Sequence, residues 1–180
     1  MQTVYLCRHS QSLYNAGINK GFDTSLSIQG IHQAHVLATM VESKLGGLQN
    51  IDCFTSPYLR CLQTSNAIFK YCPQTFLVDE RLGEQAGDEH VERGYQNVYS
   101  RSEIFKNFKW SKNLSDGSYY INYQKEKDVL GFINKLTNTS FLVTHRPVIK
   151  KIMEIYGHEP VDVENCAVIR VNKSGMERII

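Results

Sequence analysis

The chain has 180 residues, of which 42% are hydrophobic, and these values are typical of one globular domain with a substantial core. The formal net charge is +2, so the overall charge gives no reason to expect nucleic acid or a membrane surface as the main partner. The five cysteines form no Cys-x-x-Cys pair, and no apolar run approaches the roughly 20 residues of a membrane span. With no signal segment before the first strand, we expect a cytoplasmic protein with free thiols and no metal site.

Strands and helices are predicted to alternate along the chain. Apolar runs of four or five residues predict strands, and apolar residues at helical spacing predict the helices between them. Ser27 is a suitable N-cap for the first helix, which ends before Gly46. The predicted elements are a strand from residue 4 to the Arg8-His9 pair, a helix from 27 to 46, a strand at 51–55, a helix at 59–71, a strand at 75–78, a helix at 126–136, a strand at 141–145, a helix at 147–156 and strands at 167–171 and 177–180.

This order predicts a single α/β domain over residues 1–180. We expect a three-layer α/β/α sandwich with a mostly parallel sheet and helices on both faces. From Arg81 to about Gln124 the periodicity is lost, and glycines, charges and aromatic residues are mixed. Because an insertion this long in a compact domain is usually functional, we interpret residues 85–124 as a small lid.

Two histidines and two arginines lie at or just after the ends of three predicted strands. Arg8 and His9 end the first strand, His145 ends another, and Arg60 comes one helical turn after the strand at 51–55. The carboxyl ends of parallel strands meet at one edge of the sheet, where ligands of such folds bind. We therefore expect these four side chains to meet at one site.

Such a set suits phosphoryl transfer. Guanidinium groups bind phosphate oxygens, and an imidazole with a reference pKa of about 6.5 is neutral often enough to attack phosphorus. The leaving oxygen needs a proton, for which Glu84 is the candidate donor. The sequence has no phosphate-binding loop of the Gly-x-x-x-x-Gly-Lys-Ser/Thr kind, no Cys followed six residues later by Arg, and no carboxylate cluster with metal spacing.

Several motifs in one order resemble the histidine phosphatase superfamily, also called the phosphoglycerate mutase-like family. The first family motif, Arg-His-Gly-x-Ser/Thr-x-x-Asn, corresponds to Arg-His-Ser-Gln-Ser-Leu-Tyr-Asn at 8–15. The next, Asp-x-x-Leu-Ser/Thr-x-x-Gly-x-x-Gln-Ala, is matched over 23–34, and Thr-Ser-Pro-x-x-Arg-x-x-Gln-Thr is matched without exception over 55–64. The acid and second histidine motifs resemble residues 82–84 and 143–145.

The resemblance implies a role for each matched residue. His9 is then the nucleophile, and Glu84 the proton donor. The remaining phosphate pocket consists of Arg8, Arg60 and His145. The residues implied to touch phosphate or substrate are Asn15, Gln11, Ser12 and Gly21. The resemblance implies no metal and no organic cofactor.

Two positions depart from the family motifs. Ser10 follows the nucleophile and Arg146 follows the second histidine, where the family has glycine. Because glycine permits a close backbone approach, these side chains are candidates for crowding the pocket. Arg146 has two other interpretations, an additional cation for a multiply charged substrate or a solvent-facing residue at a helix start.

The leading function is a phosphomonoesterase acting on a small phosphorylated metabolite, with a phosphoprotein as the second substrate class. A phosphoglycerate mutase-type phosphotransferase uses the same chemistry, but the short insertion favours hydrolysis. A catalytically degenerate phospholigand-binding protein is a further alternative, given Ser10 and Arg146. Nucleic acid is a weaker candidate because acidic residues largely cancel the basic ones in the predicted lid.

Overall fold

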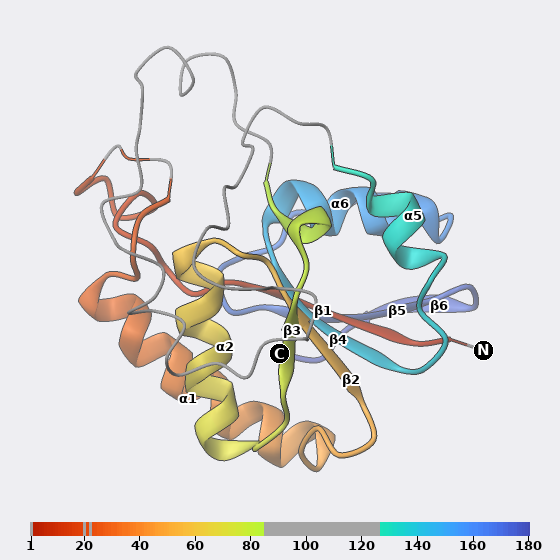
Figure 1. Ribbon diagram of the computed structural model, residues 1–180, viewed down its shortest axis with the longest axis horizontal. Helices are drawn as coiled ribbons and strands as arrows, with labels where there is room; N and C mark the ends of the chain where they lie inside the picture. The colour runs from red at the N-terminus through yellow and green to blue at the C-terminus, as the bar shows by residue number, and fades with distance from the viewer. Residues whose placement is uncertain (1, 20, 22, 85–126) are drawn as a thin grey trace, which may run out of the picture.

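The computed structural model describes residues 2–19, 21, 23–84 and 127–180, and the described chain is built on one six-stranded sheet (Figure 1). The strand order is β3-β2-β4-β1-β5-β6. Neighbouring strands are parallel from β3 to β1, whereas β5 and β6 run antiparallel to their neighbours. The strands are β1 Val4–Arg8, β2 Asp52–Thr55, β3 Phe76–Val78, β4 Ser140–Thr144, β5 Val168–Asn172 and β6 Gly175–Arg178.

Helices cover both faces of the sheet. Helices α1 (Ile28–Leu45) and α2 (Leu59–Tyr71) pack on one face, and α5 (Val129–Ile133) and α6 (Arg146–Ile155) pack on the other (Figure 1). A short 3-10 helix, η1 (Glu80–Leu82), follows β3. The predicted three-layer sandwich is confirmed. In the part of the chain that the structure describes, no helix is long and apolar enough to cross a membrane.

Burial on both faces explains why the central strands are apolar almost throughout. In β1, Leu6 packs in the core beneath α5 and α6, while Cys7 packs in the core beneath α1 and α2. All five residues of β4 are buried, with Leu142 on the first side and Phe141 on the second. Such near-continuous hydrophobic strands are expected of a parallel sheet covered on both faces.

The predicted ends of α1 are confirmed by its caps. The Ser27 hydroxyl accepts the backbone N–H of Gly30, which satisfies one of the donors at the start of the helix. Gly46 ends the helix in the left-handed conformation, with φ of 68°.

The prediction of a helix over residues 126–136 was wrong in length. Helix α5 covers Val129–Ile133, and the Asp128 side chain caps it by accepting the N–H of Gly131. After it, the backbone N–H groups of residues 135 and 136 bond to carbonyls three residues back, so the chain leaves the α-helix in tighter turns. The predicted lid at 85–124 lies outside the described residues.

Candidate active site

The carboxyl ends of the parallel strands bring His9, Arg60 and His145 together. His9 follows β1, and its backbone N–H donates to the carbonyl of Thr144 at 3.1 Å. Ser56 follows β2, and its N–H donates to the carbonyl of Val143 at 2.9 Å. His145 comes directly after β4 and is the N-cap residue of α6. The sheet ladder therefore fixes the backbone on which the site is built.

The His9 imidazole is held in one tautomer. Its side chain is buried, and Nδ1 lies 2.7 Å from the carbonyl oxygen of Ser10. Since a carbonyl can only accept, Nδ1 carries the proton and the lone pair is on Nε2. That lone pair accepts the Nε–H of Arg60 at 3.2 Å. Nε2 is thus the nitrogen that can attack an electrophile in front of the arginine.

Arg60 connects three ionisable groups of the site, His9, Glu84 and His145. In addition to its bond to His9, its Nη2 donates to Glu84 Oε2 at 2.9 Å and lies 3.2 Å from Nδ1 of His145. The guanidinium carbon lies 4.8 Å from the ring centroid of Tyr58, so the ring face supports the cation from one side. Arg60 is the second residue of α2, and the helix start after β2 places it at the strand ends.

His145 is fully buried, and its imidazole ring contacts both polar and aromatic side chains. Its Nε2 lies 2.8 Å from the Ser56 hydroxyl, and its ring packs edge-on against Tyr58 and His9. Its Nδ1 lies 3.5 Å from Oε2 of Glu84. These contacts hold the imidazole in a fixed orientation beside the nucleophile.

Both imidazoles are neutral near pH 7. Burial lowers the pKa of His9 well below its usual value, and the positive charge of Arg60 lowers it further despite the opposing bond to Ser10. Burial likewise lowers the pKa of His145, followed by the charge of Arg60. A neutral His9 retains its nucleophilic lone pair.

Glu84 is held beside His145 and Arg60 by its backbone. The Tyr58 hydroxyl donates to the Glu84 carbonyl, and the Thr144 hydroxyl donates to the carbonyl of Leu82 at 2.6 Å. The carboxylate contacts both Arg60 and His145. The Arg60 guanidinium thus stabilises negative charge at a position that lies beside His145.

The predicted substrate residues after His9 mainly shape their own loop. Asn15 Oδ1 accepts both the backbone N–H and the hydroxyl of Ser12. The Gln11 side chain accepts the hydroxyl of Ser27, and its backbone N–H donates to the Gln33 side chain. These bonds join the loop to the start of α1.

Gly30 permits this close approach between helix and loop. A Cβ built at Gly30 would lie 1.9 Å from the carbonyl oxygen of Gln11, so no other residue fits there without moving the loop. Gly21, the other predicted contact, lies in the loop after Asn19 and donates its N–H to the Asn19 side chain.

The two departures from the family motif have different outcomes. The Ser10 hydroxyl is buried and lies 2.9 Å from the Cys166 thiol, so this side chain is directed to the loop before β5 and not to the His9 ring. Of the two candidates for crowding the pocket, Ser10 thus has its hydroxyl at the Cys166 thiol. Arg146 is half exposed and forms an ion pair with Asp162 at 3.6 Å.

Arg8 lies at the side of the site near that pair. Its Nη1 donates to the carbonyl of Val163 at 2.7 Å, while its buried Nε has no hydrogen-bond partner within the described residues. Burial lowers the pKa of the Arg8 guanidinium, and the charge of Arg146 lowers it further. Among the described residues, no group of three potential metal ligands occurs.

Three residues that the sequence did not single out support the site. Ser56 contacts His145, the Thr64 hydroxyl accepts the N–H of Ser10 at 3.1 Å, and the Asn165 side chain donates to the His9 carbonyl at 2.8 Å. Ser56 and Thr64 belong to the matched motif at 55–64, so the motif itself was a signal for them. Asn165 lies 156 positions from His9, and no local pattern marks it.

Comparison with known families supplies the decisive match. The family model of the histidine phosphatase superfamily (branch 1) matches residues 4–172. The chain belongs to the histidine phosphatase superfamily. The site described above therefore lies within the residues that the family model matches.

Curated relatives of this chain are similar to it over parts of their length. The chain is 34% identical over 67 residues to human 6-phosphofructo-2-kinase/fructose-2,6-bisphosphatase 1, covering 37% of this chain and 14% of that protein. It is 37% identical over 86 residues to the probable phosphoglycerate mutase GpmB of Yersinia pestis, covering 47% of this chain and 38% of GpmB. The matched segments thus span less than half of either relative.

Solved structures share the whole fold. A phosphoserine phosphatase from Entamoeba histolytica, in complex with 3-phosphoglyceric acid, has a TM-score of 0.63 at 17% identity and covers 100% of this chain and 96% of its own. A putative phosphohistidine phosphatase SixA from Agrobacterium tumefaciens has a TM-score of 0.61 at 16% identity, with 99% and 96% covered. At such identities the likeness shows the fold alone, and the relatives' names include both phosphatases and mutases.

Proposed function

We propose that this histidine phosphatase is a phosphomonoesterase that forms a covalent phosphohistidine on Nε2 of His9. One observation carries the proposal: the Ser10 carbonyl holds the proton on Nδ1, which leaves the lone pair of a neutral, buried imidazole directed toward Arg60. Arg60 and Arg8 supply positive charge for phosphate oxygens, so the proposal needs no metal and no organic cofactor.

In the first step, Nε2 of His9 attacks phosphorus and the bond from phosphorus to the ester oxygen breaks. The electron pair of that bond goes to the leaving oxygen, which takes a proton from the protonated carboxyl of Glu84. Glu84 is placed for this role because it contacts Arg60 and His145, which would flank the same phosphate. A phosphate that takes the place of the carboxylate on Arg60 removes this ion pair and lets Glu84 hold a proton.

In the second step, water attacks the phosphorus and gives a proton to the Glu84 carboxylate, while the bond from phosphorus to Nε2 breaks. This releases inorganic phosphate and restores neutral His9. A mutase differs in that an alcohol group takes the place of water. The substrate that we propose is a small phosphate ester. Hydrolysis of a phosphopeptide, measured beside it, tests whether the substrate is instead a phosphoprotein.

The test is hydrolysis of an aryl phosphate in the presence of a metal chelator, combined with trapping of the phosphoenzyme by denaturation at alkaline pH. Wild type is expected to turn over and to give an acid-labile, alkali-stable phosphohistidine, and His9→Ala is expected to give neither. His32→Ala is the matched control, because His32 lies on the exposed side of α1. Activity that persists in His9→Ala, or a wild type without turnover or phosphoenzyme, contradicts the proposal.

A second experiment tests the proton donor. Glu84→Gln keeps the side-chain shape but has no carboxyl proton to transfer. The variant is expected to slow hydrolysis of alkyl phosphates more than that of nitrophenyl phosphate, whose leaving group needs no proton. Equal slowing of the two esters removes Glu84 from this role.

A further inference from the structure

A cluster of exposed charges adjoins the phosphate pocket. We define the rim cluster as Arg146, Lys150 and Asp162. Arg146 and Lys150 are four residues apart on α6, so they lie on one side of the helix. Asp162 Oδ1 lies 3.6 Å from Arg146 Nη1 and 2.9 Å from Lys150 Nζ. All three side chains are open to solvent.

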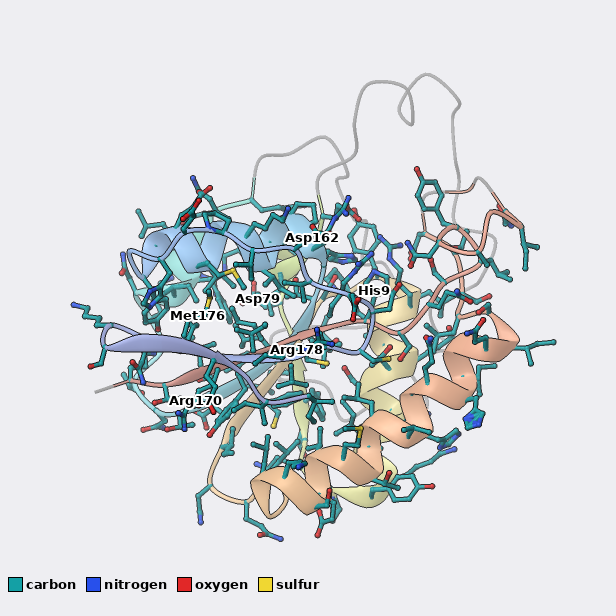
Figure 2. All side chains as sticks on the ribbon, turned by 180° about the vertical axis from the view of Figure 1, so that it is seen from behind. His9, Asp79, Asp162, Arg170, Met176 and Arg178 are labelled. Atoms are coloured by element: carbon teal, nitrogen blue, oxygen red, sulfur yellow. The ribbon has the colours of Figure 1, made fainter. Side chains whose placement is uncertain are left out.

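The rim cluster is joined to the proposed active site by sequence neighbours and by charge. Arg146 directly follows His145, and Asp162 directly precedes Val163, whose carbonyl accepts the Arg8 guanidinium. The pKa of Asp162 is lowered first by Lys150 and then by Arg146 and Arg8. Figure 2 shows His9 and Asp162 toward the same end of the sheet, with Met176 at the far end. Two cations therefore pair with one carboxylate, next in the chain to the Val163 carbonyl that binds Arg8.

The balance of charge in this region favours an additional anion. Asp162 neutralises one of the two cations of the rim cluster, and its side chain is 70% exposed. An exposed ion pair of this kind is weak and rearranges readily when another anion arrives. The N-terminal end of the ten-residue helix α6 adds partial positive charge at the same place.

We propose that the rim cluster binds a second anionic group on the same molecule as the phosphate ester, so that the substrate is a doubly anionic metabolite. The second group is a phosphate or a carboxylate, because a guanidinium and an ammonium recognise both. This inference rests on the proposed function. It gives Arg146, which departs from the family motif, a role in substrate specificity.

The experiment compares matched esters that differ by one anionic group. Propyl phosphate and propanediol bisphosphate differ by a phosphate, and glycerol phosphate and phosphoglycerate differ by a carboxylate. The proteins are wild type, the double variant Arg146→Gln/Lys150→Gln, and the control Lys151→Gln. Lys151 lies on the same helix and pairs with Glu154, outside the rim cluster.

Wild type is expected to prefer the doubly anionic member of at least one pair by about ten- to a hundredfold in kcat/KM, mainly through KM, as expected for one or two charged hydrogen bonds. The double variant is expected to lose about tenfold or more of that preference, while Lys151→Gln retains it. The pair that shows the preference identifies the second group as phosphate or carboxylate. Equal kcat/KM within both pairs, or a preference that survives in the double variant, overturns the inference.

Binding measurements separate this inference from the proposed function. If no ester is hydrolysed, the phosphatase proposal fails, and calorimetric titration of wild type and the double variant with the same esters tests the rim cluster. Tighter binding of a doubly anionic ester that the double variant loses supports the inference. Equal binding of both members of each pair overturns it.

Discussion

The histidine pocket and the rim cluster use positive charge in opposite ways. In the pocket, His9, Arg60 and His145 are buried, and directional hydrogen bonds fix each of them. In the rim cluster, Arg146, Lys150 and Asp162 are exposed and are related by ion pairs that water screens. Burial fixes the reacting atoms, whereas exposure leaves the charges beside them free to adapt to a substrate.

The largest effect on activity is expected when the shape of the Arg60 side chain changes but its charge does not. Arg60→Lys keeps the cation but loses the planar group that reaches His9, Glu84 and His145 together. Hydrolysis of an aryl phosphate is expected to fall by about 100- to 1,000-fold in kcat/KM. The control is Arg178→Lys, at an exposed site in β6. A loss below threefold would show that charge alone suffices there.

The next largest effect is on stability, and it tests how closely α1 packs against the loop that contains Gln11. Gly30→Ala gains about 1 kcal/mol of helix propensity, but its Cβ meets the Gln11 carbonyl, a backbone group that cannot move alone. We expect a net loss of about 1–3 kcal/mol in the free energy of unfolding, measured in urea, because overpacking dominates. Gln29→Ala, at the exposed neighbouring position of α1, is the control. Equal stability of the two variants contradicts the close packing.

The buried histidines also predict how stability depends on pH. Their pKa values are lowered in the folded protein, so below about pH 6.5 the unfolded chain binds protons that the folded chain does not. The free energy of unfolding should therefore fall on acidification, by up to about 1.4 kcal/mol per pH unit for each histidine. Urea titrations from pH 7.5 downward measure this slope, which His9→Asn should reduce. A flat profile between pH 6.5 and 5 would show that these groups are accessible to protons in the folded state.

The smallest effect is expected in the rim cluster. Asp162→Asn removes the only acidic member of the cluster, so doubly anionic esters should bind about two- to fourfold more tightly at low salt and lose that gain at high salt. The melting temperature should not change, because the side chain is exposed. KM values at two ionic strengths and a thermal melt test this. Destabilisation comparable to that of Gly30→Ala would remove the distinction between the two regions.

Local patterns predicted the elements well where signals agreed with one another. The Ser27 cap and Gly46 marked both ends of α1, and the boundaries of α2 were predicted at Leu59 and Tyr71. The helix expected at 126–136 was too long because its apolar spacing continued past the point where the backbone tightens after Ile133. Periodicity indicates which residues face the core, but it does not specify where a short helix stops.

The sequence by itself determined the alternating order of strands and helices, the family, and the two arginines and two histidines near the strand ends. Hydrophobic periodicity, helix caps and sequence motifs are all encoded by residues that are close together in the chain. The tertiary structure decided the tautomer of His9, the direction of the Ser10 side chain toward Cys166, the support of His145 by Ser56, and the grouping of Arg146 with Asp162. Each of these depends on where side chains point, and the last three also join residues far apart in the chain. Such contacts follow from strand register and helix packing, which no local pattern specifies.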